Sequence, residues 1–306
     1  MKNRAIAIGI FWALLVAVLA WRAPGFFDPE NLRDIAVTNA SSLIVAIGMT
    51  LVIVAGEIDV SVGSQFAVVS VIAGLLAKAG LPLFAVAVFA MCAGAAIGAL
   101  NGLIVTKLGV PSIVATLAAM AFWRELLRWE TQGAWVQGLP STFQWMGLGQ
   151  GAGEAGILLS TALLFGAVVW GMRNLQGGRA IYAVGSRRES ARLAGIPVQG
   201  ISFGVFLMMG ALTGLAALLD SVRFSQIQSN SGQGLELKAI SAVVIGGAAI
   251  SGGKGSLWGT LLGASVLAAI APSLTFLGIN AFWEKAIQGA IILSAIVLER
   301  VTARAR

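Results

Sequence analysis

Long uncharged stretches of apolar residues recur along the chain, and the run at 82–106 contains no charged residue. About 20 such residues in a helix span the hydrocarbon core of a bilayer. Only 11% of the residues are charged, against about 25% in a soluble domain, and the mean hydropathy is +0.90. The sequence therefore predicts an all-α polytopic membrane protein, with residues 1–306 forming a single transmembrane domain.

About ten transmembrane helices are expected. The candidate spans are 5–21, 37–56, 60–77, 82–106, 111–128, 154–172, 199–219, 237–251, 256–272 and 281–298. The first span also resembles a signal peptide cleaved after Ala20. We expect an uncleaved helix instead, because the rest of the chain also lies in the membrane.

Two connections are long, and their composition indicates which side of the membrane each occupies. The loop 173–198 is rich in arginine, and with ten spans most of the 20 Lys and Arg residues lie on its side. Basic residues favour the cytoplasmic side. We therefore expect a cytoplasmic loop at 173–198, cytoplasmic N- and C-termini, and an external loop at 129–153, whose tryptophans suit a membrane interface. The net charge of +7 is explained by this orientation, and no nucleic-acid partner is expected.

A weak internal repeat divides the chain into two related halves. Residues 51–64 align without a gap on residues 243–256, with identities at Ile53/Ile245, Ile58/Ile250, Gly63/Gly255 and Ser64/Ser256. In both copies an apolar run stops at a small polar stretch and a second run begins. Interrupted helices at matching places in two halves are typical of a transporter's substrate path.

The first interruption, at 56–64, contains Glu57 and Asp59. A carboxylate at membrane depth costs about 2.5–3.5 kcal/mol, so the functional interpretation is a re-entrant break that lines the path. The alternative is a tight cytoplasmic turn whose acids face water. The residues expected along the translocation path are Asp59, Ser61, Ser64, Asn101, Thr116, Glu236 and Ser251.

Glycines recur every fourth residue at Gly94–Gly98–Gly102 and at Gly255–Gly259–Gly263. Such ladders let helices approach closely in lipid, so we expect a packing role. Asn101, beside the first ladder, faces either the path or a neighbouring helix.

Several chemistries are excluded. The chain has no histidine and a single cysteine, Cys92, so neither a Cys/His metal site nor a His-based triad is expected. The segment 247–256 resembles a phosphate loop, but Ala248 replaces its first glycine and Gly255 follows the lysine in place of Ser or Thr. We expect no cofactor in this chain and no enzymatic activity, and any ATP must be bound by a partner.

Within the arginine-rich loop, residues 189–194 are predicted to form a short helix that ends at Gly195 and Pro197. Such a helix is suited to transmit the motion of a soluble partner. The alternative is a solvated loop that only sets the topology.

Four stretches carry a family resemblance: 48–64; 101–117; 178–185 with 191–196; and 234–247 with 251–260. Together they resemble the permease subunits of bacterial ABC importers in the branch that serves ribose, other monosaccharides and autoinducer-2. One departure is Glu57, where the ribose-type pattern has Gly.

The resemblance implies a bacterial inner-membrane complex. Its partners would be a second permease copy or paralogue, a cytosolic ABC ATPase with two fused ATP-binding domains, and a periplasmic sugar-binding protein. Residues 189–195 fit the Glu-Ala-Ala-x₃-Gly coupling pattern of importer permeases. The residues expected to contact the ATPase are Glu189, Ser190, Ala191, Arg192, Gly195 and Ile196.

The stretch 131–140 resembles the outer loop of rhamnose-type and autoinducer-2-type permeases, so a rhamnose-like deoxyhexose or a pentose is favoured as substrate. The alternatives are autoinducer-2, a nucleoside or a branched-chain amino acid. An ATP-independent facilitator or channel is the rival from another class.

Overall fold

A computed structural model of the chain describes residues 12–14, 16–280, 282–290 and 293. An N-terminal apolar helix at Trp12–Arg22 precedes the labelled elements. These are η1 (Pro24–Phe27), α2 (Pro29–Val54), α3 (Val62–Lys78), α4 (Leu83–Lys107), α5 (Ser112–Thr131), η2 (Gln144–Gly147), α6 (Gln150–Asn174), α7 (Gln176–Ser186), α8 (Arg188–Leu193), α9 (Val198–Ser221), α10 (Leu235–Ile245) and α11 (Leu257–Phe276). The predicted all-α fold is confirmed over these residues.

In the described part of the chain, the helices long and apolar enough to cross a membrane are α2, α4, α6, α9 and α11. They coincide with predicted spans, as do the shorter α3 and the more charged α5. The span predicted at 237–251 is wrong in extent, because α10 already ends at Ile245. The spans predicted at 5–21 and 281–298 lie partly outside the described residues, and their described parts are helical apart from a turn at Phe282.

The first glycine ladder packs helices together, as predicted, and so do Gly259 and Gly263 of the second, whereas Gly255 lies in the non-helical stretch before α11. A methyl group at Gly94 or Gly98 would overlap backbone atoms of α9, one at Gly263 would overlap the backbone of α10, and one at Gly259 would overlap that of Gly246, the residue that follows α10. The ladders therefore hold α4 against α9 and α11 against α10. The C-terminal half of α2 is fully buried among these helices.

Helix α2 and helix α10 end in the same way. After α2, the N–H of Gly56 donates to Ile53 O at 2.9 Å, and that of Glu57 to Val52 O at 3.0 Å. After α10, Gly247 donates to Val244 O and Ala248 to Val243 O. Both are Schellman caps, which require a left-handed residue, and Gly56 and Gly247 have φ of 81° and 89°.

Each cap opens a non-helical stretch before the next helix, 55–61 in the first half and 246–256 in the second. We call these the first break and the second break. The structural match pairs Gly56 with Gly247, whereas the gapless alignment pairs Gly56 with Ala248. The predicted interruptions therefore exist, but the sequence register between the halves is wrong by one residue.

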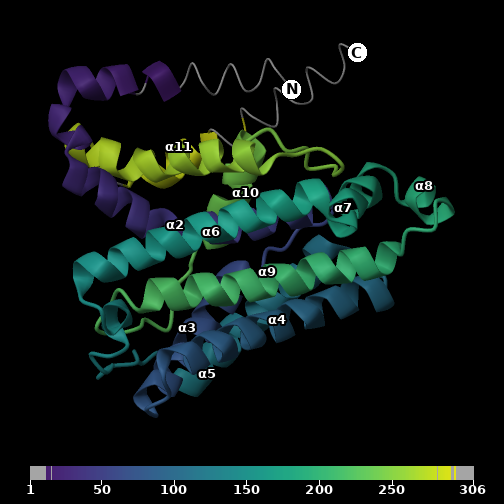
Figure 1. Cartoon of the computed structure of the whole chain (residues 1–306), viewed down its shortest axis with the longest axis horizontal. Helices are drawn as coiled ribbons and strands as arrows, with labels where there is room; N and C mark the ends of the chain where they lie inside the picture. Colours follow the sequence, from purple (N-terminus) through teal and green to yellow (C-terminus); the bar gives the residue numbers. More distant parts are fainter. Residues whose placement is uncertain (1–11, 15, 281, 291–292, 294–306) are drawn as a thin grey trace.

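The two long connections lie at opposite ends of the bundle (Figure 1). Helix α6 joins them, and its 25 residues extend about 37 Å. At one end, α7 and α8 protrude, and we call this the coupling end. At the other end, residues 132–149 lie on the connection from α9 to α10, where Val136 and Ile227 exchange backbone hydrogen bonds of 2.9 Å. We call this the loop end.

Candidate functional site

The first break is organised around a carboxylate that is fully buried, that of Asp59. Its Oδ1 accepts hydrogen bonds from the backbone N–H of Ser61 at 2.9 Å and from the Ser61 hydroxyl at 2.6 Å. Its Oδ2 accepts a longer bond of 3.3 Å from the Gln65 amide. The non-helical backbone of 59–61 is thus fixed by its own side chains.

Two neighbouring helices also fasten this break. From α4, the Asn101 amide donates to the Ser61 hydroxyl at 2.8 Å. From α5, the Thr116 hydroxyl accepts from the Val60 N–H at 3.1 Å and the Ser112 hydroxyl from the Ile58 N–H at 3.2 Å. Backbone N–H groups that a continuous helix would satisfy internally find side-chain acceptors here instead.

The structure therefore brings together five of the predicted path residues: Asp59, Ser61, Ser64, Asn101 and Thr116. All five are buried inside the protomer. Gln65 and Ser112 belong to the same cluster and were missed by the sequence analysis. Their helical spacing from Ser61 and Thr116, at i+4 and i−4, was the available signal.

The remaining two predicted path residues lie elsewhere. Glu236, in the first turn of α10, packs against Gly63 at the start of α3, where a methyl group would collide with its Oε2. Ser251 is exposed in the second break, near Gly56, and is not part of the buried cluster.

Glu57 forms an ion pair with Arg188, the first residue of α8. Its side chain is only 4% exposed, whereas that of Arg188 is 52% exposed. The sequence alternative in which the acids of this break face water is wrong, since Glu57 and Asp59 are both buried. The break and the coupling end are joined by this pair.

Helix α8 is the predicted short helix of the coupling segment. It ends in a third Schellman cap, in which the Gly195 N–H donates to Arg192 O and the Ile196 N–H to Ala191 O, both at 3.0 Å. Gly195 has φ 77°. Ala191 is buried beneath the helix, while Glu189 and Arg192 pair with each other at 2.8 Å, with side chains 63% and 72% exposed. The cap gives Gly195 and Ile196 of the predicted coupling segment a structural role, because their N–H groups close the end of α8.

Helix α7 contacts both breaks. A methyl group at Gly185 would overlap the carbonyl oxygen of Val54, at the end of α2, and lie 2.6 Å from the N–H nitrogen of Gly253. The Tyr182 hydroxyl donates to Gly255 O at 3.0 Å, and partial burial raises the pKa of this hydroxyl. The sequence analysis did not single out Tyr182 or Gly185 individually.

The breaks also touch each other. The Gly253 N–H of the second break donates to the Val54 carbonyl of α2 at 2.8 Å. A carbonyl at a helix C-terminus has no partner within its own helix. Here the other half of the molecule supplies it, so α7 and the two breaks form one junction at the coupling end.

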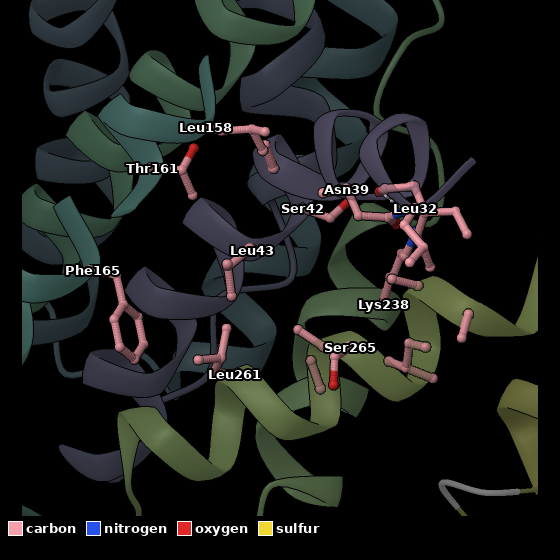
Figure 2. A pocket seen from close by; sticks show the side chains of 18 of the residues that line it. Leu32, Asn39, Ser42, Leu43, Leu158, Thr161, Phe165, Lys238, Leu261 and Ser265 are labelled. Atoms are coloured by element: carbon pink, nitrogen blue, oxygen red, sulfur yellow. Dashed lines mark hydrogen bonds between the residues drawn. The ribbon is translucent and has the colours of Figure 1, made fainter. Parts of the chain in front are cut away.

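A cavity of about 510 Å³ lies between α2, α6, α10 and α11 (Figure 2). Its walls are largely apolar, with Leu43, Leu158 and Phe165 among them. Lys238 donates to Asn39 at 2.8 Å at one side of it. Such a lining offers few partners for a polyhydroxylated molecule.

Comparison with known proteins finds one matching family and several similar proteins. Residues 31–296 match the family described as "Branched-chain amino acid transport system / permease component". The ribose import permease protein RbsC of Escherichia coli K12 is 34% identical over 290 residues, 94% of this chain and 90% of that protein. The autoinducer 2 import system permease protein LsrC of E. coli K12 / DH10B is 34% identical over 292 residues, 94% of this chain and 85% of that protein.

No solved structure matches the chain significantly. The family match covers most of the sequence, and both import permeases align along nearly their whole length. The resemblance drawn from the four motifs is thereby confirmed. This chain belongs to the family of branched-chain amino acid transport system permease components, in the branch that contains the ribose and autoinducer-2 import permeases.

Proposed function

We propose that this chain is the membrane-spanning subunit of an ATP-driven importer, that it forms the path for a monosaccharide, and that α8 couples it to a cytosolic ATPase. The observation that carries the proposal is the junction at the coupling end. One compact segment, α7–α8, presents a solvent-exposed helix at its tip and contacts both helix breaks at its base.

Coupling requires an exposed contact surface and a stiff link to the path. Glu189, Ser190 and Arg192 supply exposed polar groups on α8, and Ala191, Gly195 and Ile196 fix its shape through the cap. Gly185 and Tyr182 of α7 and Arg188 of α8 supply the link to the breaks. Because packed contacts transmit displacement, a shift of α8 is expected to move α7 and the second break relative to the first break, which side chains of α4 and α5 hold in place.

In this mechanism the ATPase pair closes on ATP and moves α8, and the bundle passes from an inward-open to an outward-open state. A loaded binding protein docks at the loop end and delivers the cargo. The buried cluster of Asp59, Ser61, Ser64, Asn101 and Thr116 acts as a fixed point of the path next to the moving α7–α8 segment and second break. No covalent step occurs in this subunit.

The proposed complex contains a second permease copy or paralogue, an ATPase with two fused ATP-binding domains and a periplasmic sugar-binding protein. It lies in the bacterial inner membrane with both termini and the coupling end in the cytoplasm. The relatives' names support a sugar or sugar-derived cargo. Within that class we favour a rhamnose-like deoxyhexose or a pentose, from the resemblance at 131–140.

The coupling role is tested by Gly195→Asp and Arg192→Glu, assayed for uptake in cells that also express the ATPase and binding protein encoded beside this chain. Both variants are expected to abolish uptake and to leave membrane insertion intact. Gly177→Asp is the matched control, since Gly177 lies at the same end with open space around it. Normal uptake by both coupling variants would refute the role of α8.

A charge swap separates docking from helix stability. Glu189→Arg combined with Arg192→Glu restores the pair within α8 but presents reversed charges to a partner. If the pair only stabilises α8, the double variant regains uptake; the proposal expects it to remain inactive.

The rival function is an ATP-independent facilitator. The purified chain alone in liposomes is expected to show no flux of D-ribose or L-rhamnose, whereas robust flux would favour the rival. Competition of uptake by autoinducer-2, nucleosides and branched-chain amino acids distinguishes the remaining cargo alternatives.

A further inference from the structure

A second cavity, of about 310 Å³, lies at the loop end beneath the connection from α9 to α10. Its volume is at the small end of the usual range for ligand pockets, about 300–1,000 Å³, and suits one small ligand. The path residues predicted from the sequence contribute nothing to it.

The lining of this cavity is polar, unlike that of the cavity between α2, α6, α10 and α11. Asp220 at the end of α9, Gln226, Gln228 and Ser231 in the connection, and Ser70 in α3 all reach it. Amide and hydroxyl groups both donate and accept hydrogen bonds, and the Asp220 carboxylate accepts them, so the lining can pair with the hydroxyls of a sugar.

Two of these groups lack a hydrogen-bond partner among the residues that the structure describes. The hydroxyls of Ser70 and Ser231 are buried and make no hydrogen bond to the described residues. Ser70 is only 1% exposed and sits in the middle of α3. A buried hydroxyl without a partner costs free energy, so its position in the cavity wall indicates a polar occupant.

Phe224 adds an apolar platform to the polar wall. It lines the cavity, and the Arg223 guanidinium lies over its ring with Cζ 5.3 Å from the centroid. The same arginine donates to Asp220 Oδ1 at 3.4 Å and to the Thr38 hydroxyl at 2.8 Å. One flat face with surrounding polar groups matches a sugar ring, whose C–H face packs on an aromatic ring while its hydroxyls bond to polar side chains.

The position of the cavity fits delivery from outside. It lies at the end opposite α8, where the 129–153 loop rests on the 222–234 connection through Val136–Ile227, Trp145–Val222 and Ser229–Gly133 hydrogen bonds. In the proposed orientation this end faces the binding protein.

We infer that the cavity formed by Ser70, Asp220, Phe224, Gln226, Gln228 and Ser231 is the receiving site for a monosaccharide on its way from the binding protein into the bundle. This inference rests on the proposed function, and it adds to it the chemical class and the place at which the permease itself contacts its cargo.

Uptake kinetics in the complete importer test the site. Gln226→Ala and Gln228→Ala, both at exposed positions where folding is not at risk, are each expected to raise the KM for sugar uptake about tenfold, equivalent to about 1.4 kcal/mol. Gln233→Ala is the matched control, because Gln233 is exposed in the same connection but does not line the cavity. An unchanged KM in both cavity variants would overturn the site.

Ser70→Ala is expected to weaken uptake without lowering the stability of the protein. It removes a buried hydroxyl that has no partner in the described part of the chain, so thermal stability is expected to stay the same or rise while the KM rises. A fall in both stability and uptake would indicate a purely structural role for Ser70 and would contradict the inference.

A labelling experiment on the full chain alone keeps the two proposals distinguishable. In a Cys92→Ala background, Gln226→Cys in nanodiscs is treated with a thiol reagent, with and without saturating D-ribose or L-rhamnose. Either sugar is expected to slow labelling, while glycine betaine at equal osmolarity is not. No protection in a chain that supports uptake overturns the site alone, whereas the absence of ATP-driven sugar uptake in the unmodified complex refutes the proposed function and with it the assignment of a sugar.

Discussion

The two breaks use the same backbone device but are held in different ways. Each follows a Schellman cap, at Gly56 in the first and Gly247 in the second. The first break is fixed by side chains, with Asp59 at the centre and Asn101 and Thr116 reaching it from other helices. The second break is rich in glycine and is fixed mainly through backbone groups, by the Gly253 bond to Val54 and the Tyr182 bond to Gly255.

This difference suggests that the two breaks have different mechanical roles. A break fixed by several side chains from α4 and α5 is anchored to the rest of its half. A break held through a few backbone contacts to α7 and α2 is free to follow the coupling segment. We infer that the first break is the fixed partner and the second the moving one, and three groups of substitutions test this comparison.

The largest effect is expected at the junction of both breaks. Gly185→Val would drive a side chain into Val54 and Gly253, and such overpacking costs about 3 kcal/mol or more. We expect loss of uptake and a strongly lowered unfolding temperature of the purified protein. Gly177→Val in the same helix has open space and should leave both properties near wild type, apart from a small loss of helix propensity. Equal behaviour of the two variants would show that α7 does not bind the breaks tightly.

An intermediate effect is expected when one polar side chain is removed from each break. Asp59→Ala leaves the backbone and hydroxyl donors of Ser61 without their acceptor and removes one of the two bonds of the Gln65 amide, which should destabilise the protein by about 2 kcal/mol. Ser251→Ala, at an exposed position of the second break, should be neutral. Thermal unfolding followed by tryptophan fluorescence measures both. A neutral Asp59→Ala would remove the distinction between the breaks.

The smallest effect concerns the ion pair between the first break and α8. Arg188→Gln removes the cation beside buried Glu57, and because Arg188 is half exposed we expect a loss of only about 1 kcal/mol. Adding Glu57→Gln should recover most of this loss, since the buried charge is then absent. A double-mutant cycle without coupling energy would show that the pair does not link break and coupling segment.

Much of the fold follows from local patterns in the sequence. Uncharged apolar runs predict α4, α6, α9 and α11 within about four residues, but they miss the charged first two turns of α2, which begins at Pro29 and not at 37; the glycine ladders predict close helix packing. The short α8 and its end at Gly195 also follow from local signals, because a Schellman cap needs a left-handed residue at that position.

Other features depend on contacts that no local pattern encodes. Residues 246–250 remain apolar, so hydropathy continues the predicted span past Ile245, although the backbone turns there at Gly247. The role of Gly185 arises from the approach of α7 to α2, which are distant in sequence. In the sequence, the residues of the loop-end cavity form an ordinary polar connection. The cavity becomes apparent only in the fold, which places Ser70 of α3 beneath them.

The central claim is that α8 faces the cytoplasm and receives the motion of an ATPase. Side-specific labelling of Ser190→Cys in a Cys92→Ala background tests it most directly, because Ser190 is exposed on α8. The account predicts that a membrane-impermeant maleimide labels this cysteine only in inside-out vesicles, and more slowly when the ATPase is bound. Labelling from the outside of intact spheroplasts would contradict it, because no cytosolic ATPase could then reach α8.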